Sequence, residues 1–481
     1  MKFVLNSKNI TIIMSIVFVI YFMFGTAFRF RFDIIPHNGY YGVLTDAFWN
    51  HQLHLRIQPH PKLLELTAPY DPVKTKPYRL HDATLHDGKY YLYWGPVPVI
   101  LRTVTLDLMS QMFYTFVYIF GCAFASLLLL RHIKRRFFPE KSDWYVVIAF
   151  VFMAFNGPVF HLLGADAIYY ESIAAGQFFF LCGLLFYLKS LAAREKKGHS
   201  KLLFIASLFL ALSIGTRISF AFPAFLIWGY ELFRIRAYMF LETWDPKMFK
   251  KSLAISGPLV FIFMFLGWYN WQRFGNPLDF GLAEQLIGFL PPPEYSASIL
   301  KNLPNNVLNY FFGLPSFAAS PPYVYTDFER FPMVERTVFS IAIVSPLISL
   351  IFFPITLKPG ARKLFWFLLG LEVMLLFQIL YFMYFATTRY MYDLIFYLNL
   401  AGAIKFFASS SKWIRVYLLA TLPLVIFICV GFWFWAIGEY FPVQYVRFNQ
   451  FMYKISGNNK AFVNPNIPDE ILKYGIVEKV N

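Results

Sequence analysis

The chain has 481 residues, of which 58% are hydrophobic, 21% aromatic and only 15% charged, and this composition excludes an ordinary water-soluble protein. Its formal net charge is +16, but the cations lie in short clusters between apolar runs, so we expect no nucleic-acid partner. The three cysteines all lie inside apolar runs, at spacings that indicate neither a disulfide framework nor a metal site.

Apolar runs of about 18 residues or more recur along the chain, long enough to cross about 30 Å of hydrocarbon as helices. We therefore predict an all-α integral membrane protein with about eleven spans. The first run is too long for the core of a signal peptide and has no small-residue cleavage site, so we expect it to be retained. The predicted spans cover residues 9–28, 112–130, 144–163, 170–190, 202–216, 218–233, 252–269, 337–357, 364–386, 390–408 and 414–437.

Alternate connections between these spans are strongly basic, namely 131–136, 194–197, 234–251, 358–363 and 405–415. The positive-inside rule places these connections and the N-terminus in the cytoplasm, and eleven spans then place the C-terminus outside. This pattern holds only if the tight junction at 215–218 separates two spans. We thus expect a membrane domain over 1–437, with outer loops 29–111 and 270–336 and a short outer turn near 164–171, followed by an outer tail over 438–481.

The first outer loop carries the most informative sequence. Residues 39–55 place apolar and aromatic side chains at helical spacing, which predicts an amphipathic helix at the membrane interface with Asp46 as its acid. Further on, Asp87-Gly88 lies between β-prone stretches and predicts a hairpin turn. Six of the nine histidines lie in this loop, but their spacing does not suit metal ligands, so we predict no required metal or other cofactor.

Several pieces in order resemble the outer-face segments of bacterial GT-C glycosyltransferases, a superfamily similar to protein O-mannosyltransferases and the lipid A aminoarabinose transferase. They are the stretch from Thr45-Asp-Ala-Phe-Trp49 to His54-Leu55, Asp82 with Asp87-Gly-Lys-Tyr-Tyr-Leu-Tyr-Trp-Gly-Pro96, Tyr169-Tyr-Glu-Ser-Ile-Ala-Ala-Gly176, Tyr269-Asn-Trp-Gln-Arg-Phe-Gly-Asn-Pro-Leu-Asp-Phe-Gly281 and Thr388-Arg-Tyr-Met-Tyr-Asp393. The resemblance implies a multi-pass enzyme of the bacterial cytoplasmic membrane whose site faces the periplasm. It also implies a polyprenyl-phosphate sugar as donor, and a glycan, lipid or protein of the cell envelope as acceptor.

In such an enzyme a carboxylate acts as general base on the acceptor hydroxyl, and a cation stabilises the leaving phosphate. The family usually carries an acidic pair just after the first span, where this chain has His37-Asn38. Either Asp46 takes over the role of the base, or His37 does, or the chain is not an active transferase. We favour Asp46.

The other candidate residues lie near the outer ends of the spans. Glu171 is a second candidate for catalysis. Arg389, Arg273 and Lys89 are candidates for binding the donor phosphate; an Arg389–Asp393 pair and snorkelling of Arg273 explain these arginines about as well. We expect the remaining substrate contacts to come from Tyr40, Tyr41, Asp82, Asp87, Asp166 and Tyr170.

Other functions remain open. A transporter or flippase of lipid-linked sugars usually has repeated halves and polar residues at mid-membrane; this sequence shows no repeat, and Glu372 is the conspicuous charge within a span. A polymerase or ligase of the O-antigen type usually carries its large outer loop late in the chain, whereas here it follows the first span. A binding or scaffold role leaves the polar residues of the outer face without a purpose.

Overall fold

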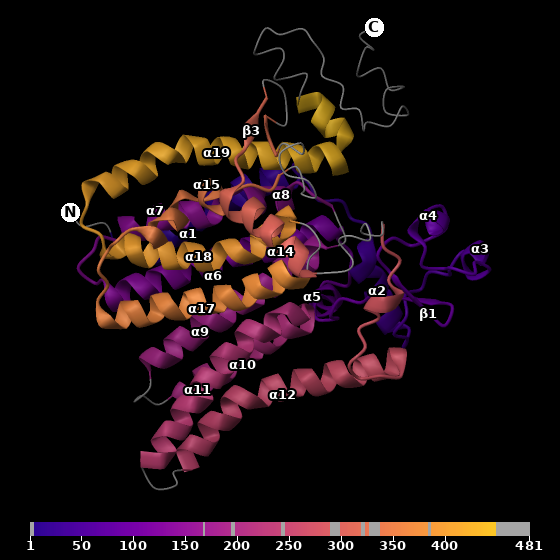
Figure 1. The fold of residues 1–481 in the computed structure, drawn as a ribbon, viewed down its shortest axis with the longest axis horizontal. Helices are drawn as coiled ribbons and strands as arrows, with labels where there is room; N and C mark the ends of the chain where they lie inside the picture. Colours follow the sequence, from indigo (N-terminus) through magenta and orange to yellow (C-terminus); the bar gives the residue numbers. More distant parts are fainter. Residues whose placement is uncertain are drawn as a thin grey trace. The chain divides into compact units, whose positions relative to one another are not determined.

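The computed structural model describes residues 4–166, 169–193, 198–241, 246–288, 299–318, 323–326, 337–382 and 386–448. These residues are mostly helical, as predicted (Figure 1). By length and composition, eight of their helices are able to cross a membrane, or nine if one bent pair counts as a span. The chain divides into two compact units, Met1–Phe32 with Thr115–Tyr170 and Ile299–Asn481, and Asp33–Tyr114 with Glu171–Ser298.

The first unit is built almost entirely of helices. Its long helices are α1 (Ser7–Gly25), most of α6 (Gln111–Phe137), α17 (Pro359–Phe382), α18 (Thr388–Ala408) and α19 (Lys412–Tyr440). The shorter elements are α7 (Trp144–Ala154), α8 (Gly157–Leu163), α14 (Ile299–Val307), α15 (Ile341–Val344), α16 (Pro346–Ser349), the π-helix η3 (Leu308–Phe312), the 3₁₀ helix η4 (Leu350–Phe352) and the strand pair β3 (Ser316–Phe317) and β4 (Val324–Tyr325).

The predicted span 144–163 is bent by 53° between α7 and α8. The break has a local cause, because Asn156 lies outside the helix and its side chain accepts a hydrogen bond from the backbone N–H of Val159. Pro158 follows within the first turn of α8, where its missing N–H costs nothing. The sequence from Asn156 onward therefore starts a new helix instead of continuing α7.

The prediction of one continuous helix over 337–357 is wrong. The structure has three short helices there: α15 and α16 are separated at Ser345, and the 3₁₀ helix η4 follows α16 directly from Leu350. Pro346 cannot donate to the preceding turn, so it ends α15 and starts α16. The segment packs so closely on α18 that a Cβ on Gly402 would lie 2.1 Å from the carbonyl oxygen of Leu347. Helix α17 covers the predicted span 364–386 as far as Phe382.

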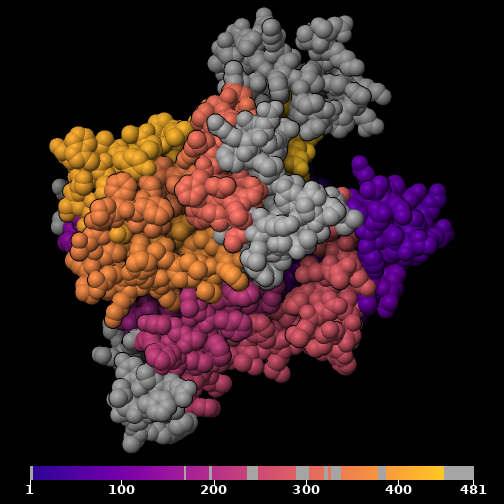
Figure 2. All heavy atoms as spheres, in the orientation of Figure 1, coloured from indigo at the N-terminus to yellow at the C-terminus, as the bar shows by residue number. Residues whose placement is uncertain are grey.

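The second unit joins long helices to a compact outer-loop segment. The long helices are α9 (Tyr170–Ala192), α10 (His199–Thr216), α11 (Ala221–Leu241) and α12 (Pro246–Phe274), with η1 (Ile218–Phe220) between α10 and α11 and η2 (Leu282–Glu284) after α12. The outer-loop segment contains α2 (Gly39–Trp49), α3 (Pro61–Leu64), α4 (Pro72–Thr75), β1 (Thr84–His86), β2 (Lys89–Tyr91) and α5 (Pro98–Val104). Residues of this segment form the indigo surface in Figure 2.

Two predictions within this unit are confirmed. Helix α10 ends at Thr216 and a separate apolar helical stretch follows from Ile218, so the junction at 215–218 separates two candidate spans. Strands β1 and β2 pair antiparallel through a two-residue turn at Asp87 and Gly88, whose φ angles of 46° and 68° are those of a hairpin turn with the favoured twist.

Helix α2 is shorter than the predicted 39–55. It ends at Trp49, because Asn50 caps it and His51 has a left-handed φ of 56°. The helix packs on α5, and its buried side includes Tyr41 and Leu44.

Candidate active site

Asp46 lies near the end of α2, on the partly exposed side of the helix. Its two carboxylate oxygens lie 3.1 and 3.0 Å from Nη1 of Arg56, and Asn50 donates to Oδ1 at 3.1 Å. Arg56 is itself exposed, with 45% of its side chain accessible, against 23% for Asp46. The favoured base of the sequence analysis is therefore held in a surface ion pair.

A buried network lies in the same unit, around Arg102 of α5. The side chain of Arg102 is completely buried and makes a forked contact with Glu171, Nε to Oε1 at 3.0 Å and Nη2 to Oε2 at 2.6 Å. Its Nη1 donates to Oδ1 of Asp107 at 2.6 Å, and both carboxylates are fully buried. The guanidinium also lies 4.1 Å over the ring of Tyr114. Burial alone would lower the pKa of Arg102, but the charges and hydrogen bonds of Glu171 and Asp107 outweigh it and raise this pKa.

His37 extends this network to the surface. Its Nδ1 lies 3.0 Å from Oδ2 of Asp107, its backbone N–H donates to the Asp107 carbonyl at 3.3 Å, and 38% of its side chain is exposed. The backbone of His37 is left-handed, with φ of 55°, and a Cβ on Gly42 would lie 2.5 Å from its carbonyl carbon. Trp49 meets the imidazole edge to face at 5.6 Å. The ring is therefore fixed by Asp107 on one nitrogen, and a strained backbone sets its direction.

The charges of these four groups matter for the chemistry. One arginine and two carboxylates carry a net charge of −1 when the imidazole of His37 is neutral. When the imidazole takes up a proton, the network becomes neutral. A carboxylate on Nδ1 also favours the tautomer with its proton there, which leaves the Nε2 lone pair to accept a proton. The arrangement suits a general base whose positive charge is compensated by the buried groups behind it.

The predicted substrate residues of the first outer loop surround the hairpin. The Tyr40 hydroxyl donates to the carbonyl of His81, and the Tyr41 hydroxyl donates to the Gly95 carbonyl at 3.1 Å. Burial, followed by the charge of Asp82, raises the pKa of Tyr40. Asp82 itself is mostly buried, 3.6 Å from the His81 ring. The hydrogen bonds of Tyr40 and Tyr41 thus hold α2 against the chain on either side of the hairpin.

The hairpin turn exposes the two remaining candidates of this loop. Lys89 is exposed at the start of β2, and 87% of the Asp87 side chain is accessible. Asp87 lies 3.5 Å from Nε2 of His86, whose Nδ1 lies 2.7 Å from Glu284 of η2. The His86 ring thus lies between two carboxylates beside the turn, while Lys89 faces solvent.

Arg273, a predicted phosphate ligand, is buried at the end of α12 and uses all three of its nitrogens within the protein. It donates to the Leu92 carbonyl at 2.6 Å, to Oδ1 of Asn270 at 2.6 Å and to the Tyr269 carbonyl at 3.3 Å. The guanidinium also lies 3.9 Å from the centre of the Tyr269 ring. This geometry joins α12 to the chain directly after β2.

The first unit contains the other predicted residues. Arg389, at the start of α18, lies 4.4 Å over the ring of Tyr169 and is half-buried. The hydroxyl of Tyr170 lies 3.0 Å from Nε2 of His161, and Asp166 is exposed. Glu372 is 1% exposed, and both of its carboxylate oxygens lack a hydrogen-bond partner among the described residues.

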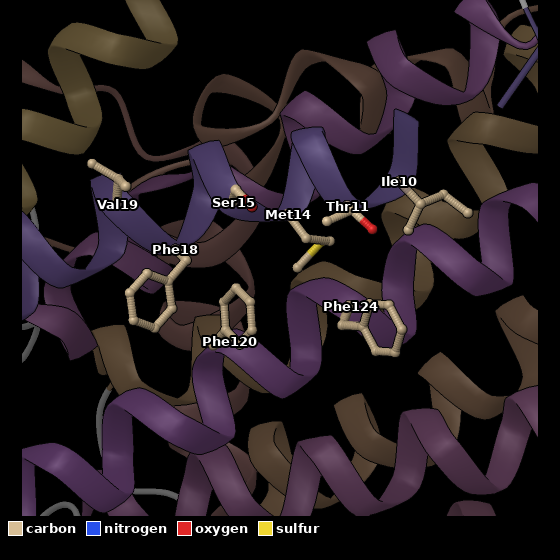
Figure 3. A pocket seen from close by; sticks show the side chains of 8 residues that line it. All are labelled: Ile10, Thr11, Met14, Ser15, Phe18, Val19, Phe120 and Phe124. Atoms are coloured by element: carbon tan, nitrogen blue, oxygen red, sulfur yellow. The ribbon is translucent and has the colours of Figure 1, made fainter. Parts of the chain in front are cut away.

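A groove of about 510 Å³ lies in the first unit between α1 and α6 (Figure 3). Its lining consists of Ile10, Thr11, Met14, Ser15, Phe18, Val19, Phe120 and Phe124. The polar side-chain groups of this lining are the hydroxyls of Thr11 and Ser15. The lining contains no acid, base or nucleophile suited to sugar transfer. Within the ranges that the structure describes, no three His, Cys, Asp or Glu side chains form a group able to hold a metal ion.

Sequence reasoning missed Arg102 and Asp107. Arg102 follows the apolar run Val97–Leu101, and an arginine among apolar residues just before a membrane span is a recognisable signal for a buried functional group. Its partner Asp107 lies only five residues further along, but its pairing with Glu171 was not readable, because Glu171 lies 69 residues further along the chain. The network combines this local pair with residues that only the fold brings near, Glu171 and His37.

No protein-family model matches the chain, and no curated protein matches it. Among solved structures, the chain is similar to the archaeal oligosaccharyltransferase AglB from Archaeoglobus fulgidus in complex with an inhibitory peptide and a dolichol-phosphate. The identity is 11% over 95% of this chain and 61% of that one, with a TM-score of 0.37.

Two other structures of the Archaeoglobus fulgidus oligosaccharyltransferase also match. The apo form is 12% identical over 97% of this chain and 60% of that one, and the form tethered to an acceptor peptide is 11% identical over 89% and 55%; both TM-scores are 0.33. The chain therefore spans about three fifths of the length of these proteins. Scores of this size carry no argument about this chain, and the proposal below rests on its own residues.

Proposed function

We propose that this chain is a glycosyltransferase that moves a monosaccharide from a polyprenyl-phosphate donor to a hydroxyl of a cell-envelope acceptor at the outer face of the membrane. The observation that supports it best is the half-exposed imidazole of His37, held through Nδ1 by the buried carboxylate of Asp107. The candidate membrane spans and the sequence resemblance to GT-C enzymes point to a lipid-linked donor.

In the proposed step, Nε2 of His37 accepts the proton of the acceptor hydroxyl. The acceptor oxygen then forms a bond to the anomeric carbon of the sugar, while the bond from that carbon to the phosphate oxygen breaks. The electron pair of the broken bond leaves with the polyprenyl phosphate, and the proton stays on the imidazole until solvent removes it. Asp107 and the net negative charge behind it stabilise the imidazolium that forms.

Arg102 and Glu171 act in this scheme as positioning residues. Glu171 is fully buried by its forked contact with Arg102, so it reaches neither donor nor acceptor. Its role is to hold Arg102, which in turn fixes Asp107. Asp46 contacts Arg56 at the surface and belongs to a separate ion pair.

The test compares purified protein in lipid nanodiscs with two variants, His37→Gln and Asp46→Asn. The donors are undecaprenyl phosphates carrying mannose, glucose or aminoarabinose, supplied with cell-envelope extract, and the readout is the release of undecaprenyl phosphate. We expect turnover with one donor, a loss of at least about 100-fold in His37→Gln, and a change within about threefold in Asp46→Asn. Full turnover by His37→Gln removes His37 as the base, and no turnover by the wild type with any donor counts against the reaction class.

One observation favours a second function, a transporter of lipid-linked sugars. A buried carboxylate such as that of Glu372 in α17 is energetically costly in a membrane, and residues of this kind are often functional. Such a protein would move the lipid-linked sugar across liposomes without releasing polyprenyl phosphate. The same donor panel in proteoliposomes separates movement of the sugar from cleavage of its phosphate bond.

A further inference from the structure

Helix α5 buries its charged residue and exposes two apolar side chains, the reverse of a helix on a water-facing surface. Its charged residue, Arg102, is completely buried, whereas Ile100 is 56% exposed and Val104 is 76% exposed. A helix at a water-facing surface buries its apolar side chains and exposes its charges. This helix turns its charge inward and exposes Ile100 and Val104, although Val99 remains buried.

The same inversion continues after the helix. Asp107 is completely buried, but its neighbours Leu106 and Leu108 are 63% and 46% exposed. Both Leu106 and Asp107 have left-handed backbones, with φ of 56° and 49°, so the chain turns sharply in order to bury one and expose the other. The inversion is therefore set by the backbone and by the contacts of the carboxylate.

A second segment of the chain, residues 33–37, extends the apolar surface. Residues 33–37 run beside 107–110, because the His37 N–H bonds to the Asp107 carbonyl and the Ser110 N–H bonds to the Asp33 carbonyl at 3.0 Å. Between these two bonds lie Ile34 and Ile35, exposed by 73% and 44%. We call the six exposed side chains the apolar rim: Ile34, Ile35, Ile100, Val104, Leu106 and Leu108.

The apolar rim lies at the ends of helices that are able to cross a membrane. Arg102 binds Glu171 in the first turn of α9, and the chain just before α5 bonds to the last residues of α10, with the Gly95 N–H on the Thr216 carbonyl at 3.1 Å. Gly95 approaches so closely that a Cβ there would lie 2.0 Å from the Gly215 carbonyl oxygen. Helices α9 and α10 are both candidate spans, so α5 is fixed where they meet the membrane surface.

We propose that the apolar rim inserts into the hydrocarbon of the outer leaflet, as a re-entrant edge of the first outer loop. The occupant is bilayer lipid, because the rim lies at the ends of two candidate spans and because Arg102 and Asp107, the charged residues between its members, are completely buried. Exposing an apolar surface of this kind to water costs free energy, whereas contact with lipid acyl chains removes that cost. The insertion places the Arg102 network beside the headgroups, with the exposed ring of His37 directly behind the rim. The inference does not depend on the reaction proposed above.

The test measures the surroundings of single nitroxide labels on the full chain in nanodiscs. In a cysteine-free background (C122A, C182A, C429A), labels are placed by Val104→Cys and Leu106→Cys. Val260→Cys on α12, 52% exposed within a candidate span, is the lipid-facing control, and the exposed Lys76→Cys after α4 is the water-facing control. Oxygen concentrates in hydrocarbon, whereas a polar nickel chelate is excluded from it. We expect the ratio of oxygen to nickel collisions at 104 and 106 to approach that at 260 and to exceed that at 76 by about tenfold.

Two results would overturn the proposal. Nickel collisions at 104 and 106 equal to those at 76 would mean that the rim faces water. Low collision rates with both reagents would mean that a protein surface, and not lipid, covers it. Because the labels report position and not turnover, these results are independent of whether any donor is used.

Discussion

Replacing Asp107 with asparagine tests the assignment of the base most directly. The change keeps the shape of the side chain but removes the charge behind His37. Because Nη1 of Arg102 donates to Oδ1 of Asp107, the amide oxygen of the variant stays with Arg102 and the amide nitrogen faces Nδ1 of His37. That nitrogen donates to Nδ1, so the proton of the neutral imidazole moves to Nε2, and the lone pair needed for catalysis is lost.

The expected loss follows from the geometry. With Nδ1 of His37 3.0 Å from Oδ2, the charge centres lie about 4 Å apart, and at an effective dielectric of about 20 their attraction is about 4 kcal/mol. Because 38% of the His37 side chain is exposed, we halve this to about 2 kcal/mol, or about 30-fold in rate. The unfavourable tautomer adds a further factor, so we expect kcat to fall by about 10² to 10³ with the donor KM unchanged.

The assay is the release of polyprenyl phosphate by protein in nanodiscs, with Asp46→Asn as the matched control, since it makes the same carboxylate-to-amide change in the same loop. Thermal unfolding and gel filtration of Asp107→Asn establish that it is folded. The reasoning is refuted if Asp107→Asn keeps turnover within about threefold of wild type while Asp46→Asn loses at least about 100-fold. An inactive Asp107→Asn together with an active His37→Gln would assign Asp107 a purely structural role.

Three further predictions concern stability and donor binding. Arg102→Met leaves two buried carboxylates without their cation, so the free energy of unfolding should fall by about 3–5 kcal/mol, measured as a lower melting temperature; an undiminished melting temperature would show that the network is not buried. Asp143 lies 2.8 Å from Lys134, and although burial alone would raise the pKa of Asp143, Lys134 and the Leu5 N–H lower this pKa. The ionised Asp143 therefore stabilises the fold above about pH 4, the ordinary aspartate range. This stabilisation is lost as the pH falls through the lowered pKa. The difference in melting temperature between wild type and Asp143→Asn should therefore shrink from pH 7 to pH 3, and a constant difference would contradict it. Arg389→Ala should raise the donor KM several-fold with little change in kcat, whereas Arg273→Lys should lower the melting temperature and leave the donor KM unchanged; the opposite pattern would make Arg273 the phosphate ligand.

Local sequence signals predicted the elements that depend on neighbouring residues. The Asp87-Gly88 turn fixes its hairpin through backbone conformation alone, and the short junction before Ile218 ends one helix and starts another. The length of the apolar runs predicted most of the candidate spans, because it too is a property of neighbouring residues. It failed at 337–357, because Pro346 interrupts a segment whose composition is otherwise that of a membrane helix.

The candidate site was less predictable, because ionisable residues choose partners that only the fold brings near. Asp46 was the conspicuous acid of the outer loop by sequence, yet the nearby Arg56 engages it at the surface. Glu171 is a candidate for catalysis by sequence, and its partner Arg102 comes from the short helix α5 within the first outer loop. His37 was noted as a departure from the family pattern, and Asp107, which gives that departure a physical meaning, was not noted at all.

Arg102 connects the two proposals through one physical requirement. A guanidinium beside the end of a candidate span must be paired and shielded, and here two carboxylates and an aromatic ring surround it. Because α5 turns Arg102 inward, Ile100 and Val104 face outward, so two residues of the apolar rim and the arginine of the buried network lie on opposite sides of the same short helix. If the rim lies in lipid, substituting Val104 with a charged residue should disturb the position of α5 and, through Arg102 and Asp107, the orientation of His37, although Val104 itself is largely exposed and has no place in the proposed chemistry.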